Sequence, residues 1–106
     1  MAVAAEIPVA FEREQGFTES EWHRCLPGAV GPHALALLAP GQARVSLTPD
    51  RGGGWLHLSW VVLPHRRIAL LSMPRLAVHY RFEAVDAAAR REFMRYFDLY
   101  MQRGGG

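Results

Sequence analysis

The sequence predicts a single α+β domain over residues 1–106. A short capped N-terminal helix leads into a four- to five-stranded antiparallel meander, and a long C-terminal helix packs across one face. Three β-rich runs between residues 55 and 82 are separated by segments containing Pro64 and Pro74, as in a meander. A capping box precedes one apolar segment, and an apolar stripe with helical spacing lies near the end of the chain. With 106 residues, half of them apolar, the chain can form one hydrophobic core.

Residues 1–17 are predicted to form an acidic edge strand or an extended arm. Ile7, Val9 and Phe11 alternate with polar or small residues, which is the period of a strand. Pro8 has no N–H to donate to a ladder, so the segment suits the edge of a sheet.

A short helix is predicted over residues 18–26. Thr18 and Glu21 have the spacing of a capping box, in which each side chain bonds to the other residue's backbone N–H. The phenylalanine before the cap and Trp22 form the matching hydrophobic staple. Pro27 and the glycine after it are expected to end the helix.

Residues 33–39 fit either a strand or a helical turn. Pro40 and Gly41 suit the two central positions of a type II turn. This favours a strand hairpin with residues 43–48, whose clean alternation points Val45 inward.

The meander is predicted as strands at residues 55–62, 67–72 and 76–82, with turns at residues 63–66 and 73–75. Strand parity then defines an inward-facing set that should form the core. This set is Leu56, Leu58, Trp60, Val62, Ile68, Leu70, Leu76, Val78, Tyr80 and Phe82.

The opposite parity defines an outer face that is half apolar, because it also carries Val61, Ala69 and Leu71. Such a surface suggests partial cover by the N-terminal segment or by another subunit. Its remaining residues are Trp55, His57, Ser59, Ala77, His79 and Arg81.

The last helix is predicted over residues 86–102, capped by Asp86. Its length matches an eight-residue strand, so it fits across the inward face of the meander. Gly104 is expected to end it, with residues 104–106 as a flexible tail. The apolar stripe consists of Ala89, Phe93, Tyr96, Phe97, Tyr100 and Met101.

Charge is distributed unevenly along the chain. Residues 1–21 hold five Glu and one Arg, whereas residues 22–106 hold eleven Arg and five acidic residues. This asymmetry can hold the N-terminal segment on its own domain or join one copy to the next. The absence of Lys is interpreted as the codon bias of a GC-rich genome, and a bacterial protein is expected.

Composition also favours a cytoplasmic protein without disulfides. Cys25 is the only cysteine, no apolar stretch is long enough for a membrane helix, and the first residues lack the basic region of a signal peptide.

An anion-binding site is predicted at one end of the sheet. The expected order brings the turn at residues 63–66, the start of the strand at residue 43 and the N-terminus of the last helix together. A helix N-terminus carries free amides and partial positive charge, which suits a phosphate or carboxylate. The alternative is a solvated rim whose arginines pair with nearby acids. The residues of the predicted site are Arg44, Arg66, Arg67, Arg81, Arg90, His65 and His79, and Trp55 and His57 are predicted to interact on the outer face.

The string Arg-Gly-Gly-Gly occurs at residues 51–54 and again at residues 103–106. The second copy, ending in Gly105 and Gly106, resembles the tails of ubiquitin-like modifiers and sulfur carriers. This resemblance implies a terminal carboxylate that reacts in an adenylating enzyme. In those families the tail follows a strand, whereas here it follows a helix, and a helix cap with a frayed tail is the alternative.

No metal, cofactor or catalytic residue is predicted. The chain lacks Cys-x-x-Cys, His-Glu-x-x-His, Gly-x-Ser-x-Gly, Gly-x-Gly-x-x-Gly and P-loop patterns. Most aromatic residues fall on core faces, which argues against nucleic-acid binding. The leading hypothesis is a non-enzymatic binding or assembly module that binds a protein partner or itself. A domain for a small anionic ligand and a diglycine carrier are the alternatives.

Overall fold

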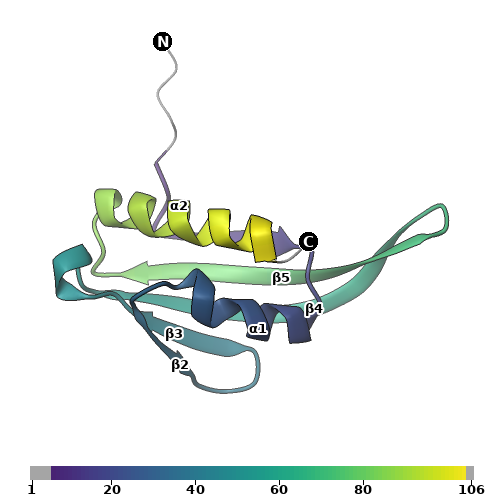
Figure 1. The fold of residues 1–106 in the computed structure, drawn as a ribbon, viewed down its shortest axis with the longest axis horizontal. Helices are drawn as coiled ribbons and strands as arrows, with labels where there is room; N and C mark the ends of the chain where they lie inside the picture. Colours follow the sequence, from purple (N-terminus) through teal and green to yellow (C-terminus); the bar gives the residue numbers. More distant parts are fainter. Residues whose placement is uncertain (1–5, 105–106) are drawn as a thin grey trace, which may run out of the picture.

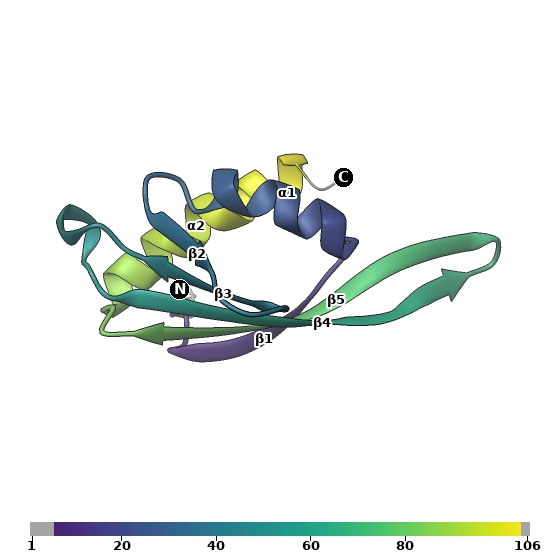
Figure 2. The ribbon, with the colours of Figure 1, turned by 90° about the horizontal axis from the view of Figure 1, so that it is seen from below.

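The computed structural model describes residues 6–104 and shows one open antiparallel sheet with two helices. The elements are β1 (Ala10–Gln15), α1 (Glu19–Ala29), β2 (Ala34–Leu37), β3 (Gln42–Ser46), the 3-10 turn η1 (Pro49–Arg51), β4 (Trp55–Ile68), β5 (Leu71–Glu83) and α2 (Ala87–Gly104). The five strands run in the order β1-β5-β4-β3-β2, and both helices lie on one face (Figures 1 and 2). The predicted α+β class is confirmed.

Within the described part of the N-terminal segment, Ala10–Gln15 form the edge strand β1, which leaves Pro8 outside the ladder. It is antiparallel to β5. Phe11 stacks on Tyr80 with ring centroids 4.7 Å apart, which fixes the inner side of the strand against the core. The outer side of β1 carries Glu12 and Glu14.

Helix α1 begins with the predicted capping box. The Glu21 backbone N–H donates to Thr18 Oγ1 at 3.1 Å, and the Thr18 N–H donates to Glu21 Oε1 at 2.8 Å. The predicted end at Pro27 was wrong, because the helix continues to Ala29. A proline so near the end removes only one intrahelical donor, and Gly31 (φ 65°) supplies the left-handed residue that ends the helix.

The strand interpretation of residues 33–39 is confirmed by the β2–β3 hairpin. Its turn is closed by the Gln42 N–H, which donates to the Ala39 carbonyl at 2.9 Å. Gly41 has φ 76°, as the third position of a type II turn requires.

The predicted turns at residues 63–66 and 73–75 were wrong. Strands β4 and β5 pair continuously from Trp55 and Glu83 to Ile68 and Leu71, and the real turn consists of residues 69 and 70. Pro64 lies within a bulge in β4. Strand β3 pairs with β4 only up to residue 59, and β1 pairs with β5 only from residue 76. Both prolines therefore lie where no third strand pairs with the ribbon, so the N–H that a proline lacks is not needed for a ladder hydrogen bond.

Beyond these neighbours the two strands continue alone as a projecting ribbon, here called the distal hairpin (residues 61–75) (Figures 1 and 2). This explains the error in the predicted core. Val62, Ile68 and Leu70 are exposed because they belong to the distal hairpin, outside the cover of the helices. The bulge also places Ile68 on the outer side of the ribbon, opposite Leu71. The other inward positions of the meander are buried, namely Leu56, Leu58, Trp60, Leu76, Val78, Tyr80 and Phe82.

Helix α2 starts at the predicted cap, where the Ala89 N–H donates to Asp86 Oδ1 at 2.8 Å. Of its predicted stripe, Tyr96 is exposed, and Met94 is buried instead. The helix extends through Gly104, which was expected to lie in a flexible tail. The remaining members of the stripe, all buried or partly buried, are Ala89, Phe93, Phe97, Tyr100 and Met101.

Candidate functional site

The distal hairpin carries a group of exposed large apolar side chains. Leu70 at its tip is fully exposed, and Val61, Ile68 and Leu71 are each more than half exposed. By strand register, one side of the ribbon carries most of the apolar residues. These residues are Val61, Leu63, Ile68, Leu71 and Met73, which continue the outer face of the sheet.

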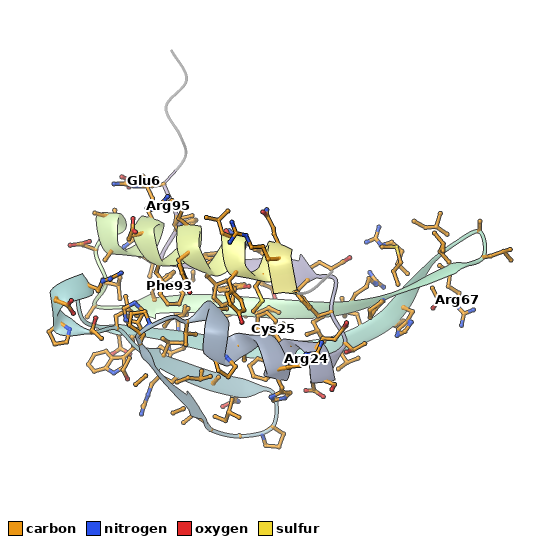
Figure 3. The ribbon with its side chains drawn as sticks, in the orientation of Figure 1. Glu6, Arg24, Cys25, Arg67, Phe93 and Arg95 are labelled. Carbon is orange, nitrogen blue, oxygen red and sulfur yellow. The ribbon has the colours of Figure 1, made fainter. Side chains whose placement is uncertain are left out.

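The distal hairpin is also basic, because residues 61–75 contain three arginines and no acid. Glu14 of β1 holds its base: Arg66 donates to Oε1 at 2.8 Å and Arg75 to Oε2 at 3.2 Å. Within residues 6–104, the Arg67 side chain makes no hydrogen bond or ion pair, and Figure 3 shows it near the tip. One cation of the hairpin therefore has no partner in the described chain.

The predicted anion cluster at one end of the sheet does not assemble, and that placement was wrong. The shifted turn carries His65, Arg66 and Arg67 into the distal hairpin, at the end opposite to the N-terminus of α2 (Figure 1). Arg90 is engaged by backbone carbonyls of Ile7 and Val85, at 2.9 and 2.7 Å.

The other members of that predicted site gather on the outer face, which no helix of the described chain covers (Figure 2). Arg44, His57 and Arg81 are direct neighbours on β3, β4 and β5. His57 Nε2 lies 2.7 Å from Glu83 Oε1, so the Glu83 carboxylate already contacts one member of this row. Anion binding by Arg44 and Arg81 stays a prediction.

The remaining outer-face residues are placed as parity predicted. His79 lies beside Ser59 in the register and is exposed, and Trp55 is 40% exposed at the far end of β4.

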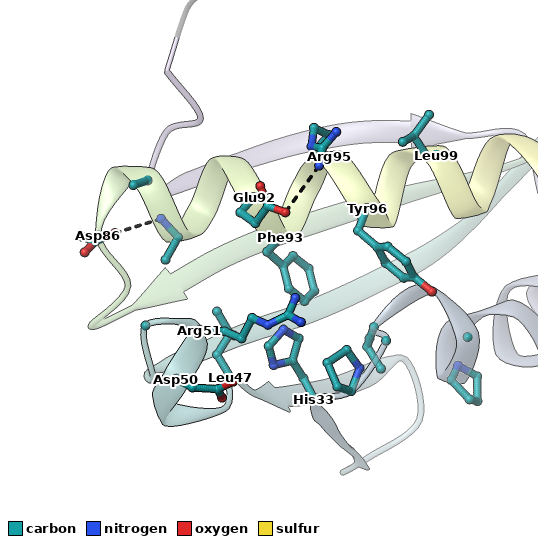
Figure 4. A pocket seen from close by; sticks show the side chains of 18 residues that line it. His33, Leu47, Asp50, Arg51, Asp86, Glu92, Phe93, Arg95, Tyr96 and Leu99 are labelled. Atoms are coloured by element: carbon teal, nitrogen blue, oxygen red, sulfur yellow. Dashed lines mark hydrogen bonds and ion pairs between the residues drawn. The ribbon is translucent and has the colours of Figure 1, made fainter.

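A cavity of about 870 Å³, which no sequence pattern indicated, lies between α2, the loop after α1 and the turn η1 (Figure 4). Phe93, Tyr96 and Leu99 line it from α2, and His33 and Arg51 line it from the loops. The lining residues lie far apart in the sequence, so no spacing pattern connects them.

The His33 ring is oriented by the backbone, since the Thr48 N–H donates to Nδ1 at 3.0 Å. Partial burial, and secondarily the positive charge of Arg51, lower the pKa of His33 below its usual 6.5, with Asp50 opposing this. His33 is therefore neutral near pH 7. The pKa of Asp50 is lowered mainly by its interaction with the Thr48 side chain, so Asp50 is ionised.

Two other ionisable groups belong to the core. Cys25 is buried. Tyr80 accepts a hydrogen bond from Gln15 Nε2 at 2.8 Å, and burial raises the pKa of its hydroxyl well above the usual 10. Among residues 6–104, no group of three or more His, Cys, Asp or Glu side chains could hold a metal ion. Gly105 and Gly106, the predicted carrier tail, lie outside the described residues.

No helix in the described part of the chain is long and apolar enough to span a membrane. The chain matches no protein-family model, no curated protein and no solved structure at a significant level.

Proposed function

We propose that this chain is a non-enzymatic assembly module that self-associates through its distal hairpin. The observation that carries the proposal is a ribbon of residues 61–75 with exposed apolar side chains and two unpaired edges. Single exposed apolar residues are ordinary, but a contiguous apolar strip on a projecting element is typical of an interface.

The backbone supports the same proposal. A two-stranded ribbon is marginally stable in water, and its free edges present N–H and C=O groups ready to pair with another chain. Neither β1 nor β3 reaches these edges. A partner strand paired along a free edge would satisfy these groups, and a partner surface packed on the apolar side would remove that side from water.

Charge favours a second copy of this chain as the partner. The distal hairpin is basic, whereas β1 is an edge strand whose outer side carries Glu12 and Glu14. Within one chain, Glu14 already binds Arg66 and Arg75. In a two-fold dimer each copy would offer both surfaces, so Arg67 of one copy would find acidic groups on the other.

The test is the mass of the protein in solution, measured by light scattering over a range of concentrations. We expect the wild type to be a dimer and Ile68→Ser/Leu71→Ser, which changes the paired residues flanking the turn, to be a monomer. Arg67→Glu should weaken the dimer, and added salt should do the same for the wild type. Leu37→Ser is the matched control, because Leu37 is 60% exposed on β2, away from the distal hairpin.

A wild-type protein that is monomeric at every concentration and insensitive to salt would exclude self-association. A dimer that survives Ile68→Ser/Leu71→Ser would exclude the distal hairpin as its interface.

A further inference from the structure

The cavity beside α2 has the size and wall chemistry of a small-molecule site. Its volume of about 870 Å³ lies within the ~300–1,000 Å³ typical of ligand pockets. Phe93 and Leu47 form buried apolar walls, and Tyr96 and Leu99 remain about half exposed. Such a cavity can enclose the apolar body of a small organic molecule.

His33 supplies a fixed hydrogen-bond donor to this cavity. Because Nδ1 accepts the Thr48 N–H, the proton of the neutral ring is carried by Nε2. The ring packs against Phe93, with centroids 5.6 Å apart, and this contact also limits its rotation. The donor is therefore held in place before any ligand arrives.

Arg51 supplies a positive charge beside this donor. In Figure 4 its side chain extends toward His33 beneath Phe93. Within residues 6–104 its guanidinium has no ion pair within 4.0 Å.

The acids of the cavity wall are mostly engaged elsewhere. Asp86 caps α2 through the Ala89 N–H, and Glu92 pairs with Arg95 at 3.5 Å. Asp50 is the exception, because it is exposed and its charge acts on both Arg51 and His33. The guanidinium and the imidazole N–H are therefore the groups best placed to receive an anion.

We propose that this cavity binds a small organic carboxylate, with its anionic group on Arg51 and His33 Nε2 and its apolar body against Phe93 and Tyr96. The planar guanidinium matches the geometry of a carboxylate. This site is separate from the distal hairpin, so its test is independent of self-association.

The experiment is an NMR titration of the full chain with benzoate and hexanoate, each compared with its uncharged amide. We expect saturable shifts of the signals of His33, Arg51, Phe93 and Tyr96, and none in the distal hairpin. Benzoate and hexanoate also distinguish an aromatic body from an aliphatic one. Arg51→Gln should weaken carboxylate binding about tenfold or more, as expected for a lost charge-assisted hydrogen bond.

His33→Asn separates the two nitrogens of the ring. Asparagine can still accept the Thr48 N–H, but its shorter side chain places no N–H at the position of His33 Nε2, so binding should weaken while the spectrum stays that of the folded chain. Arg24→Gln is the control, because Arg24 is an exposed cation on α1 outside the cavity (Figure 3).

Three outcomes would overturn the proposal. The first is that neither benzoate nor hexanoate shifts the NMR signals of the cavity residues. The second is that the uncharged amides bind as tightly as the carboxylates. The third is that the Arg51→Gln variant binds the carboxylates as tightly as the Arg24→Gln variant. In the second case the cavity would be an apolar site without a carboxylate contact.

Discussion

The two halves of the β4–β5 hairpin have similar sequences and opposite environments. Near the helices, Leu56, Leu58 and Trp60 are at most 6% exposed, whereas Val62, Ile68 and Leu70, assigned to the same inward set, are at least 54% exposed. Apolar residues at strand spacing are therefore necessary for burial but do not ensure it. Neighbouring strands and an overlying helix decide which half becomes core.

The two regions should also differ in local stability. The body, meaning the described chain without the distal hairpin, is fastened by side-chain packing, whereas the distal hairpin is held by its own ladder and by Glu14. Regions with few buried contacts open at lower free energy than the core. The hairpin should thus be locally labile in the monomer and become ordered by a partner.

The largest expected effect comes from Trp22, which is fully buried and contacts the rings of Phe17, Trp60 and Phe97. Trp22→Ala should lower the free energy of unfolding by about 3–5 kcal/mol, because it leaves a cavity in the core. Denaturant unfolding at a concentration below that of self-association measures it.

Leu70→Ser is the matched change in the distal hairpin, and it should alter the free energy of unfolding of the monomer by less than about 0.5 kcal/mol. Comparable losses for Leu70→Ser and Trp22→Ala would refute the contrast between the two regions.

A smaller effect is expected at the junction between body and hairpin. Glu14→Ala removes the carboxylate shared by Arg66 and Arg75. Exposed ion pairs contribute little, so global stability should fall by less than about 1 kcal/mol. Hydrogen exchange of the backbone amides in residues 61–75 should nevertheless become faster. Glu12→Ala is the control, since Glu12 lies opposite His79 in the body. Equal exchange rates in both variants would show that Glu14 does not anchor the hairpin.

The same contrast explains what could be predicted from the sequence. The Thr18 capping box, the Asp86 cap and the turn at Gly41 depend on residues within one turn of each other, so local pattern was sufficient. Both helices and the β2–β3 hairpin were found in this way. The alternation of inward and outward residues along the strands also predicted the buried residues correctly wherever neighbouring strands and helices are present.

The turn of the distal hairpin depends on distant pairing and was missed. Pro64 suggested a break, but whether a proline breaks a strand depends on whether a neighbouring strand needs its N–H. The true turn at Ala69 and Leu70 lacks the glycine or asparagine typical of two-residue hairpins, although Ala69 adopts φ 54°. The predicted arginine cluster was wrong for the same reason, because its placement depended on a turn at residues 63–66.

The cavity was missed because its residues come together only in three dimensions. His33, Arg51 and Phe93 belong to three separate segments, and no spacing rule connects them. A lone histidine before a short strand carries no signal of its own. The contact with Thr48 that orients it can be recognised only after the fold is known.

The smallest expected effect is a dependence of stability on pH that arises from His33 in the body and not from the distal hairpin. The folded pKa of His33 is below its usual 6.5, because of partial burial and the charge of Arg51, with Asp50 acting in the opposite direction. As pH falls through 6.5, the unfolded chain binds a proton before the folded chain does. The contribution of His33 to stability is therefore complete above pH 6.5 and decreases as pH falls toward the folded pKa.

His33→Asn removes this titration and keeps an acceptor for the Thr48 N–H, so its stability should decline less steeply below pH 6.5 than that of the wild type. Leu70→Ser, which leaves the body intact, should keep the wild-type slope. Thermal unfolding from pH 7.5 to 5, at about half-unit steps around the usual histidine pKa, measures both. Identical slopes for His33→Asn and the wild type would show that the His33 ring titrates equally in the folded and unfolded chains.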